Sequence, residues 1–179
     1  MALLDFQRNY YQLFDLPQEF LLDQAQLGAR YRQLQMELHP DRYASASAHE
    51  QRLAVQYSAL VNAAYTALRK PLDRAVYLLE LAGMGSEEIS SQQVDGGFLI
   101  AQMELREKLE SMTGMVDPQS ALDRLITEIG EDVIELQGVF SVAYSAGEFP
   151  KAAAACVKMQ YLDKLLLEAE ILETSLLDG

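Results

Sequence analysis

The sequence contains no tryptophan, one cysteine and two histidines among its 179 residues. A single cysteine cannot form a disulfide within the chain, and two histidines offer little metal chemistry, so we predict no disulfide framework and no metal centre. Glycine and proline are modest in number, and runs of Val, Ile and Thr are missing. With 50% hydrophobic residues to form a core, these absences favour an all-α protein over a β-sheet protein.

Several sequence signals of other functions are also missing. No apolar run approaches the ~20 residues that a membrane span requires. Asp5 and Arg8 interrupt the first residues, which argues against a secretory signal. No G-x-x-x-x-G-K-[ST] motif for binding nucleotide phosphates is present. We therefore expect a cytoplasmic protein without a cofactor and without ATPase activity of its own.

The net charge of −13 is distributed unevenly along the chain. Residues 1–75 hold eight basic and eight acidic side chains, whereas residues 76–179 hold six and nineteen. A nucleic-acid-binding surface needs a basic face, so this balance disfavours a nucleic-acid partner. The change in charge suggests two modules that face different partners, and an acidic surface that serves only solubility is the alternative.

A strongly periodic helical segment ends at the tripeptide His39-Pro40-Asp41. Asp23 is a candidate N-cap of this helix, which we predict to end near Glu37 because Pro40 cannot continue it. The predicted buried side consists of Leu27, Tyr31, Leu34 and Leu38. A second helix is predicted over residues 48–69, so the tripeptide lies in the loop of an antiparallel hairpin. A short helix follows from Pro71 and stops at Gly83.

Residues 1–82 resemble a J-domain, the module with which co-chaperones dock on DnaK-type chaperones and trigger their ATP hydrolysis. The resemblance rests on four motifs: Asn9-Tyr10-Tyr11-x-Leu13-Phe14-x-Leu16, the helix with Tyr31 and Arg32-Gln33-Leu34, the segment His39-Pro40-Asp41-Arg42, and Val61-Asn62-x-Ala64-Tyr65-x-x-Leu68 before Pro71-x-x-Arg74. It implies that His39, Pro40 and Asp41 contact the chaperone. Because proline limits the freedom of the loop, less entropy is lost on docking.

Three arginines near the tripeptide are candidates for the same interface: Arg30, Arg32 and Arg42. A small positive surface steers an acidic partner and speeds encounter more than it tightens binding. An ordinary solvated helix face would have the same composition. Gln33, Gln35 and Glu37 dilute the positive charge of this surface.

An enzymatic role for His39 is the competing interpretation. A histidine two residues from an aspartate could be a general base with its orienting carboxylate. However, no serine or cysteine nucleophile occupies a recognisable turn, and Cys156 follows four alanines at what we predict is a buried helix position. We therefore predict no catalytic residue. A hydrolase would differ by turning over substrate with no chaperone present.

The remainder of the chain is predicted to be a linker and a three-helix bundle. Residues 83–93 are rich in Gly, Ser and Glu and form the linker, and residues 94–179 form the bundle. Its helices are expected at about 94–112, 118–146 and 150–177. The second and third carry near-heptad apolar stripes, which predicts long antiparallel helices. Their stripes are Leu122, Leu125, Ile129, Val133, Leu136, Phe140 and Ala143, and then Leu162, Leu165, Ala169, Leu172 and Leu176.

The first bundle helix has apolar residues on two sides. At 100° per residue, one side suffices for packing: Phe98, Ala101, Leu105, Leu109 and Met112. The other side combines apolar residues with carboxylates: Leu99, Ile100, Met103, Glu104, Glu107 and Glu110. We interpret this second side as an exposed partner surface with an apolar centre and an acidic rim. The alternative is that the third helix or the N-terminal module covers it.

The second module extends the resemblance over essentially the whole chain. Phe98-Leu99-Ile100-Ala101-Gln102-Met103-Glu104-Leu105-Arg106-Glu107 and Tyr161-Leu162-Asp163-Lys164-Leu165, behind a J-domain, are similar to the HscB family of iron–sulfur co-chaperones. The resemblance implies that the bundle binds the iron–sulfur scaffold protein IscU and that the J-domain presents it to the chaperone HscA. It implies a scaffold-binding site of Leu99, Ile100, Met103, Glu104, Glu107 and Tyr161.

Two departures from the family pattern bear on this interpretation. Ser111 stands where the family often has an acidic residue, and Glu110 is the nearest substitute. The N-terminal tetracysteine segment of some eukaryotic relatives is absent, which favours a bacterial cytoplasmic protein. A J-domain co-chaperone for a different client and a helical structural adaptor with a degenerate J-domain are the alternative functions.

Overall fold

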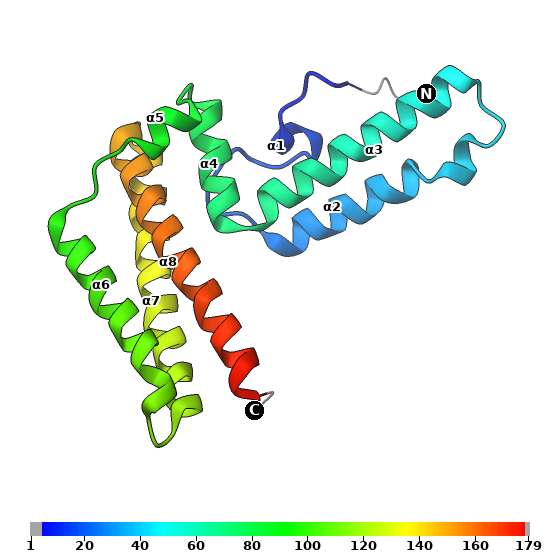
Figure 1. The fold of residues 1–179 in the computed structure, drawn as a ribbon. Helices are drawn as coiled ribbons and strands as arrows, with labels where there is room; N and C mark the ends of the chain where they lie inside the picture. Colours follow the sequence, from blue (N-terminus) through cyan, green and yellow to red (C-terminus); the bar gives the residue numbers. More distant parts are fainter. Residues whose placement is uncertain (1–4, 178–179) are drawn as a thin grey trace. The chain divides into compact units, whose positions relative to one another are not determined.

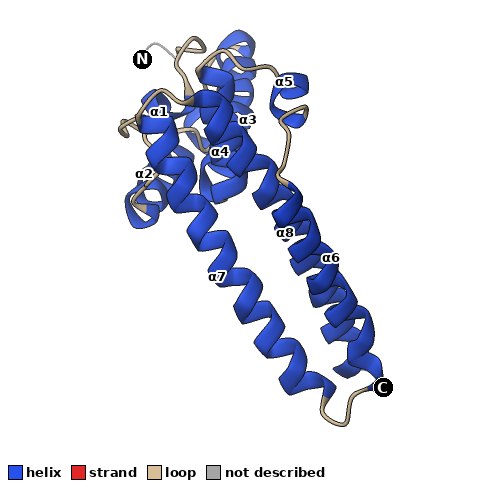
Figure 2. Ribbon diagram, turned by 90° about the vertical axis from the view of Figure 1, so that its left-hand side faces the viewer, coloured by secondary structure: helices blue, strands red, loops and turns tan. Residues whose placement is uncertain are grey.

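The structure is a computed structural model that describes residues 5–177, and all of its regular elements there are helices. The chain divides into two compact units, one ending at Leu78 and the other beginning at Leu79 (Figure 1). The predicted all-α class, with a J-domain hairpin and then a three-helix bundle, is confirmed. Figure 2 shows long helices of the second unit joined by short loops.

The first unit is built on a helical hairpin. Its elements are α1 (Tyr10–Leu13), α2 (Gln24–Glu37), the 3-10 turn η1 (Pro40–Tyr43), α3 (Ala48–Arg69) and most of α4 (Pro71–Leu81). α2 and α3 pack on each other, and η1 lies in the segment that joins them (Figure 1). Both helices have the bounds that the sequence predicts. The difference lies in the connection, because part of the predicted loop forms η1.

Side-chain caps explain where α2 and α3 begin. Asp23 accepts hydrogen bonds from the N–H groups of Ala25 and Gln26 at 2.9 and 3.0 Å, as the predicted N-cap requires. Ser47 and Glu50 form a reciprocal capping box at the start of α3. Ser47 falls in the segment predicted only as loop, so this cap refines the boundary.

The core of the first unit lies between α1, α2, α3 and α4. Leu27 is fully buried and Leu38 nearly so, whereas Tyr31 and Leu34 are half-buried. Other buried residues are Tyr11, Leu13, Phe14, Leu16, Phe20, Ala54, Tyr57, Val61, Ala64, Leu68, Ala75 and Leu78. The predicted stripe therefore forms the inner side of the hairpin, and its middle is closed by Tyr31 stacked on Tyr65 at 4.0 Å between ring centroids.

Two tyrosines and one strained aspartate fix α1. Tyr10 stacks on Tyr77 of α4 at 4.3 Å, and its N–H donates to the Tyr77 hydroxyl at 2.9 Å. The short helix ends in a Schellman arrangement with Asp15 in the left-handed region at φ 52°. Because Asp15 is not glycine, this conformation carries strain. Its carboxylate lies 3.8 Å from the guanidinium groups of both Arg8 and Arg30.

The second unit contains α5 (Ser86–Ser90), α6 (Gly96–Ser111), the 3-10 turn η2 (Met112–Gly114), α7 (Pro118–Ser145) and α8 (Phe149–Leu177). The three long helices follow the predicted ranges. Gly83 and Gly147 adopt positive φ and end α4 and α7 in Schellman arrangements, at the two stops that the sequence indicates.

The segment predicted as a linker has structure of its own. It contains α5, whose Ile89 is only 2% exposed, and α5 packs on α8. The chain also divides before the predicted linker, at Leu78. α5 covers part of the alanine-rich start of α8, where Ala152, Ala153, Ala155 and Cys156 are buried.

The bundle core lies between α6, α7 and α8, and the contact of α7 with α8 is the most extensive in the chain. Its buried residues are Leu105, Leu109, Met112, Leu122, Leu125, Ile129, Leu162, Leu165 and Ala169. Phe98 is half-buried against this cluster, while Ala101 is exposed. The core side predicted for α6 is thus correct except at Ala101.

None of the helices within residues 5–177 is long and apolar enough to cross a membrane. The long helices carry charged side chains along their length and bury one apolar stripe each, as bundle helices do.

Arg74 is a buried charge in the first unit. Arg74 is only 5% exposed, and its guanidinium donates a hydrogen bond to the carbonyl of Leu68 at 2.7 Å. The guanidinium also lies 5.0 Å from the centre of the Phe20 ring. Burial lowers the pKa of Arg74. Arg74 therefore satisfies a carbonyl at the end of α3 that no intrahelical donor can reach.

We expect Arg74→Ala to lower the free energy of unfolding by about 2–4 kcal/mol, because it leaves a cavity and an unsatisfied buried carbonyl. The matched control is the exposed Arg69→Ala in the last turn of α3, for which a change within about 0.5 kcal/mol is expected. Urea titration followed by circular dichroism measures both, and equal effects would contradict the structural role of Arg74.

Candidate protein-docking sites

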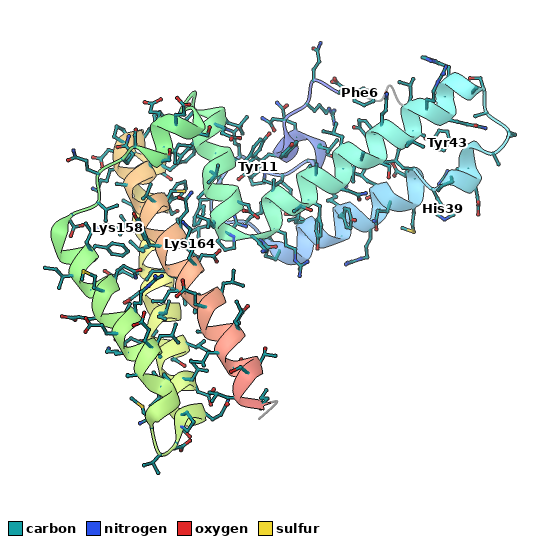
Figure 3. All side chains as sticks on the ribbon, in the orientation of Figure 1. Phe6, Tyr11, His39, Tyr43, Lys158 and Lys164 are labelled. Atoms are coloured by element: carbon teal, nitrogen blue, oxygen red, sulfur yellow. The ribbon has the colours of Figure 1, made fainter. Side chains whose placement is uncertain are left out.

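The first candidate site is the docking turn, His39, Pro40 and Asp41. α2 ends at Glu37 with Leu38 as its C-cap, and Pro40 occupies the first position of η1. The missing N–H of proline costs nothing at that position, and its fixed φ suits the start of a helical turn. The side chains of His39 and Asp41 are 60% and 90% exposed, so the turn presents both to solvent. Figure 3 shows His39 near the end of the hairpin where α2 leads into η1.

His39 has a structural role within this turn. Its Nδ1 accepts a hydrogen bond from the Asp41 N–H at 3.3 Å and so caps η1. The same nitrogen lies 3.5 Å from the Asp41 carboxylate. In the neutral imidazole that accepts at Nδ1, the proton is on Nε2, which is left as an outward donor. The turn thus offers a partner one imidazole donor and one carboxylate acceptor, held on a short, capped 3-10 turn.

The three candidate arginines are not equivalent in the structure. Arg32 and Arg42 are exposed, on α2 and η1 respectively. Arg30 is partly buried, and its guanidinium lies 3.8 Å from the Asp15 carboxylate and 3.5 Å from the Gln33 amide oxygen. It lies about 10 Å along the α2 axis from the helix end at Glu37. Arg30 is therefore engaged on the α1 side, and Arg32 and Arg42 are the freely presented charges.

An open pocket of about 540 Å³ lies beside the docking turn. Leu38, Pro40, Tyr43 and Ala44 form one wall, and α3 forms the other with Val55 and its neighbours. Its lining is mostly apolar, and Val55 is 68% exposed. Polar recognition at the turn can therefore be combined with burial of an apolar partner group next to it.

The second candidate site is the apolar patch, Leu99, Ile100, Met103 and Tyr161. The first three lie on α6 and are 42%, 61% and 65% exposed, and Tyr161 on α8 is 43% exposed. Neither α7 nor α8 covers these side chains. The alternative in which the third bundle helix covers this side of α6 is therefore wrong. Because Phe98 and Leu105 face the core, the helical angle places Leu99 and Met103 on the α8 side of the outer surface.

Carboxylates border the patch on α6. Glu104 and Glu107 are both exposed, one and two turns along the helix from Ile100. Ser111 donates its hydroxyl to the Lys108 carbonyl at 2.8 Å and is thereby satisfied within its own helix. Glu110 is exposed nearby. The patch thus has an apolar centre with negative charge along one side, as the sequence predicted for this helix.

The sequence did not reveal the contacts that hold the patch together. Asp95 caps α6 by accepting the Phe98 N–H at 2.9 Å, and its carboxylate also binds the Lys158 ammonium at 2.5 Å. Lys158 lies 5.2 Å from the Phe98 ring, and Phe98 meets Tyr161 edge to face at 6.2 Å. Lys158 and Lys164 are both on α8 (Figure 3).

The bond to Lys158 and the Phe98 N–H lower the pKa of Asp95. The stabilisation from this carboxylate is therefore complete above its ordinary pKa of 3.8 and is lost as the pH falls through the lowered value. An aspartate three residues before Phe98 is an N-cap signal that the sequence does carry. The contact of Asp95 with Lys158, which lies 63 residues later in the sequence, depends on the packing of α6 against α8.

Two further ion pairs fix α6 on its neighbours. Arg106 binds Glu168 of α8 at 2.8 Å, and Lys108 binds Glu128 of α7 at 2.8 Å. These pairs are on opposite sides of α6 and are exposed, so each contributes little to stability by itself. They lie on either side of the buried stripe of α6, and that stripe determines which side chains face outward.

The described residues contain no group of three potential metal ligands close together. Cys156 is fully buried, and burial raises its pKa to about 12, so it is a protonated thiol at neutral pH. The carboxylate of Asp41 lies 3.5 Å from the His39 imidazole, and the rest of η1 consists of Pro40, Arg42 and Tyr43, with no serine or cysteine.

A hairpin that exposes His-Pro-Asp at its end, followed by a bundle with an exposed apolar face, defines a J-domain co-chaperone. The chain belongs to the HscB family. Residues 94–170 match the family described as "HSCB C-terminal oligomerisation domain". The co-chaperone protein HscB homolog of Aeromonas hydrophila is 42% identical over 171 residues, which cover 96% of this chain and 99% of the relative.

Solved structures support the same assignment. The chaperone HscB from Vibrio cholerae has a TM-score of 0.84 and 38% identity, covering 94% of this chain and 99% of its own. The human co-chaperone protein HscB has a TM-score of 0.84 and 31% identity, covering 94% and 84%. The relatives are named as co-chaperones, a class without catalysis of its own.

We expect Asp95→Ala to speed amide hydrogen exchange at residues 98–100 several-fold, because the first turn of α6 loses its cap and its bond to Lys158. Asp117→Ala is the matched control, since Asp117 caps α7 through the Ser120 N–H at 3.2 Å. Its effect should be confined to the start of α7. Unchanged exchange at residues 98–100 in the Asp95 variant would show that the cap does not hold the patch.

Proposed function

We propose that this chain is a co-chaperone of iron–sulfur cluster assembly that acts in the cytoplasm. In this proposal, residues 94–179 bind the scaffold protein IscU, and residues 1–82 dock on the DnaK-type chaperone HscA and stimulate its ATPase. The chain itself performs no catalysis. The observation that supports this most directly is that two separate surfaces, one polar and rigid and one apolar, are exposed on the two units.

The chaperone arm is assigned to the docking turn with Arg32 and Arg42; Arg30, also a candidate from the sequence, is paired with Asp15 and is assigned a lesser part in this surface. His39 supplies a hydrogen-bond donor and Asp41 an acceptor. Pro40 limits the conformational freedom of the turn and also lines the adjacent pocket. Exposed arginines steer an acidic partner toward this end of the hairpin. The first unit has no net charge excess over residues 1–75, so steering comes from this local cluster.

The scaffold arm is assigned to the apolar patch with Glu104 and Glu107. Exposed Leu, Ile and Met side chains in one place supply the desolvated centre of an interface, and Tyr161 adds a large amphipathic anchor. The glutamates select a partner with basic groups beside an apolar surface. Joining both arms in one chain raises the local concentration of scaffold at the chaperone, so two weak contacts act together.

We expect His39→Gln to abolish stimulation of the chaperone's ATPase while scaffold affinity stays unchanged, because the imidazole at the docking turn is lost and the bundle is untouched. Steady-state phosphate release with purified HscA, with and without IscU, measures the first effect, and calorimetry measures the second. His49→Gln, an exposed histidine in the first turn of α3, is the control and should stimulate normally. Stimulation by the His39 variant at the wild-type level would exclude the docking role.

We expect the Leu99→Ala, Met103→Ala double variant to weaken scaffold binding by at least ~1 kcal/mol, since apolar anchors leave the centre of an interface. The matched control is Leu167→Ala with Ile171→Ala on α8, where the side chains are similarly exposed at 57% and 63%. Isothermal calorimetry with IscU compares them. Equal affinity of both double variants for IscU would show that the scaffold does not bind at the apolar patch. If a pull-down then captured another client, a different co-chaperone role would be favoured.

A further inference from the structure

The chain carries most of its sulfur as methionine, and the methionine side chains differ sharply in exposure. The sequence holds seven methionines and one cysteine. Within residues 5–177, three methionines are buried and three are open to solvent. The buried ones are Met84, Met112 and Met159, and the exposed ones are Met36, Met103 and Met115, at 65%, 65% and 45%. An oxidant in solution therefore reaches the exposed group first.

Cys156 does not compete for such an oxidant. It is fully buried, and burial raises its pKa to about 12, so it carries no thiolate at neutral pH. Susceptibility of a cysteine to oxidation follows its thiolate character and its exposure, and Cys156 has neither. Across the described residues, the sulfur that is available at the surface is thus the thioether of methionine.

Met103 belongs to the apolar patch and not to the bundle core. It lies about one helical turn from Leu99 on α6, and Ile100 and Tyr161 complete the patch. The buried cluster that holds α6 against α7 and α8 is built from other side chains. A chemical change at the Met103 sulfur therefore alters the patch and leaves the core of the bundle intact.

We propose that Met103 is an oxidation site through which hydrogen peroxide weakens binding of the scaffold, an inference that rests on the proposed scaffold site. The thioether sulfur attacks one oxygen of the peroxide, so an S–O bond forms as the O–O bond breaks. The leaving hydroxide takes the proton of the transferred oxygen and departs as water. The sulfur loses two electrons and the peroxide gains them, so a thioether and hydrogen peroxide become a sulfoxide and water.

The charge around Met103 favours an uncharged oxidant. Glu104 and Glu107 are exposed on the same helix, and residues 76–179 hold nineteen acidic and six basic side chains. A net negative field repels anionic oxidants, whereas it does not act on hydrogen peroxide, which is neutral at physiological pH. Hydrogen peroxide is therefore the class of oxidant that this surface admits most readily.

Oxidation removes what Met103 offers to an apolar partner. The sulfoxide converts a flexible apolar side chain into a polar one. Burying the new oxygen against an apolar surface costs desolvation that no new hydrogen bond offsets. Because methionine sulfoxide is reduced again by dedicated reductases, the loss of binding is reversible.

Peptide mapping by mass spectrometry tests the modification site on the full chain alone. After brief treatment with hydrogen peroxide, we expect sulfoxide to form several-fold faster at Met103 than at the buried Met112 and Met159. The helix content measured by circular dichroism should be the same before and after treatment. Oxidation of Met103 no faster than that of the buried methionines would overturn the proposal.

Calorimetry with IscU tests the consequence for binding. The chain is treated with hydrogen peroxide, and the peroxide is removed before IscU is added, so that only this chain is oxidised. The readout is the ratio of Kd after treatment to Kd before treatment. We expect a ratio of at least about five for the wild-type chain, as when an apolar anchor leaves an interface.

Two leucine variants locate the effect. Met103→Leu has no sulfur at the patch, so its ratio should be close to one, whatever its affinity before treatment. Met36→Leu is the matched control, because Met36 is equally exposed but lies on α2 of the first unit. Its ratio should equal that of the wild-type chain. A methionine sulfoxide reductase should return the treated wild-type chain to its starting affinity.

The outcomes separate this oxidation site from the proposed function. If the untreated chain fails to bind IscU, the proposed function is wrong, and the weakening of scaffold binding falls with it. If the untreated chain binds IscU and the oxidised chain binds equally well, only the oxidation proposal is overturned. A ratio that stays high in the Met103→Leu variant would assign the sensitivity to another residue and would also overturn it.

Discussion

A bundle helix can bury only one stripe of side chains, and this constraint determines where the second unit can function. α6 buries Leu105, Leu109 and Met112, and Arg106 and Lys108 form ion pairs with α8 and α7 on either side of this stripe. Every further apolar residue on α6 must then face solvent or a partner. The exposure of Leu99, Ile100 and Met103 follows from the core, so an exposed apolar surface arises without any change of the fold.

The first unit functions through a different constraint, the inability of proline to continue a helix. Pro40 ends α2 and begins η1, so a histidine and an aspartate are held on a short turn between two long helices. The hairpin is rigid because its inner side is buried and because Tyr31 stacks on Tyr65 and bonds Asn62 at 2.9 Å. A partner that binds the turn therefore meets groups whose positions are already fixed.

Helix bounds and buried stripes could be predicted because they depend on neighbours in sequence. Asp23, Gly83 and Gly147 act where caps and stops were expected, and the stripe from Leu122 to Ala143 forms the core side of α7. The environment of Arg30 could not be predicted, since its partner Asp15 is brought near by the fold of α1. The contact of Asp95 with Lys158 and the helix α5 depend likewise on tertiary packing.

Cys156 is the only cysteine in the chain, and the bundle encloses it completely. Burial keeps its sulfur protonated at neutral pH, whereas iron and zinc are bound by thiolates. The one thiol of this sequence is therefore kept away from the surface, where it could compete for a cluster or exchange with a disulfide. If the proposed scaffold is bound, its cluster would meet no thiol of this chain that could displace its own thiolate ligands.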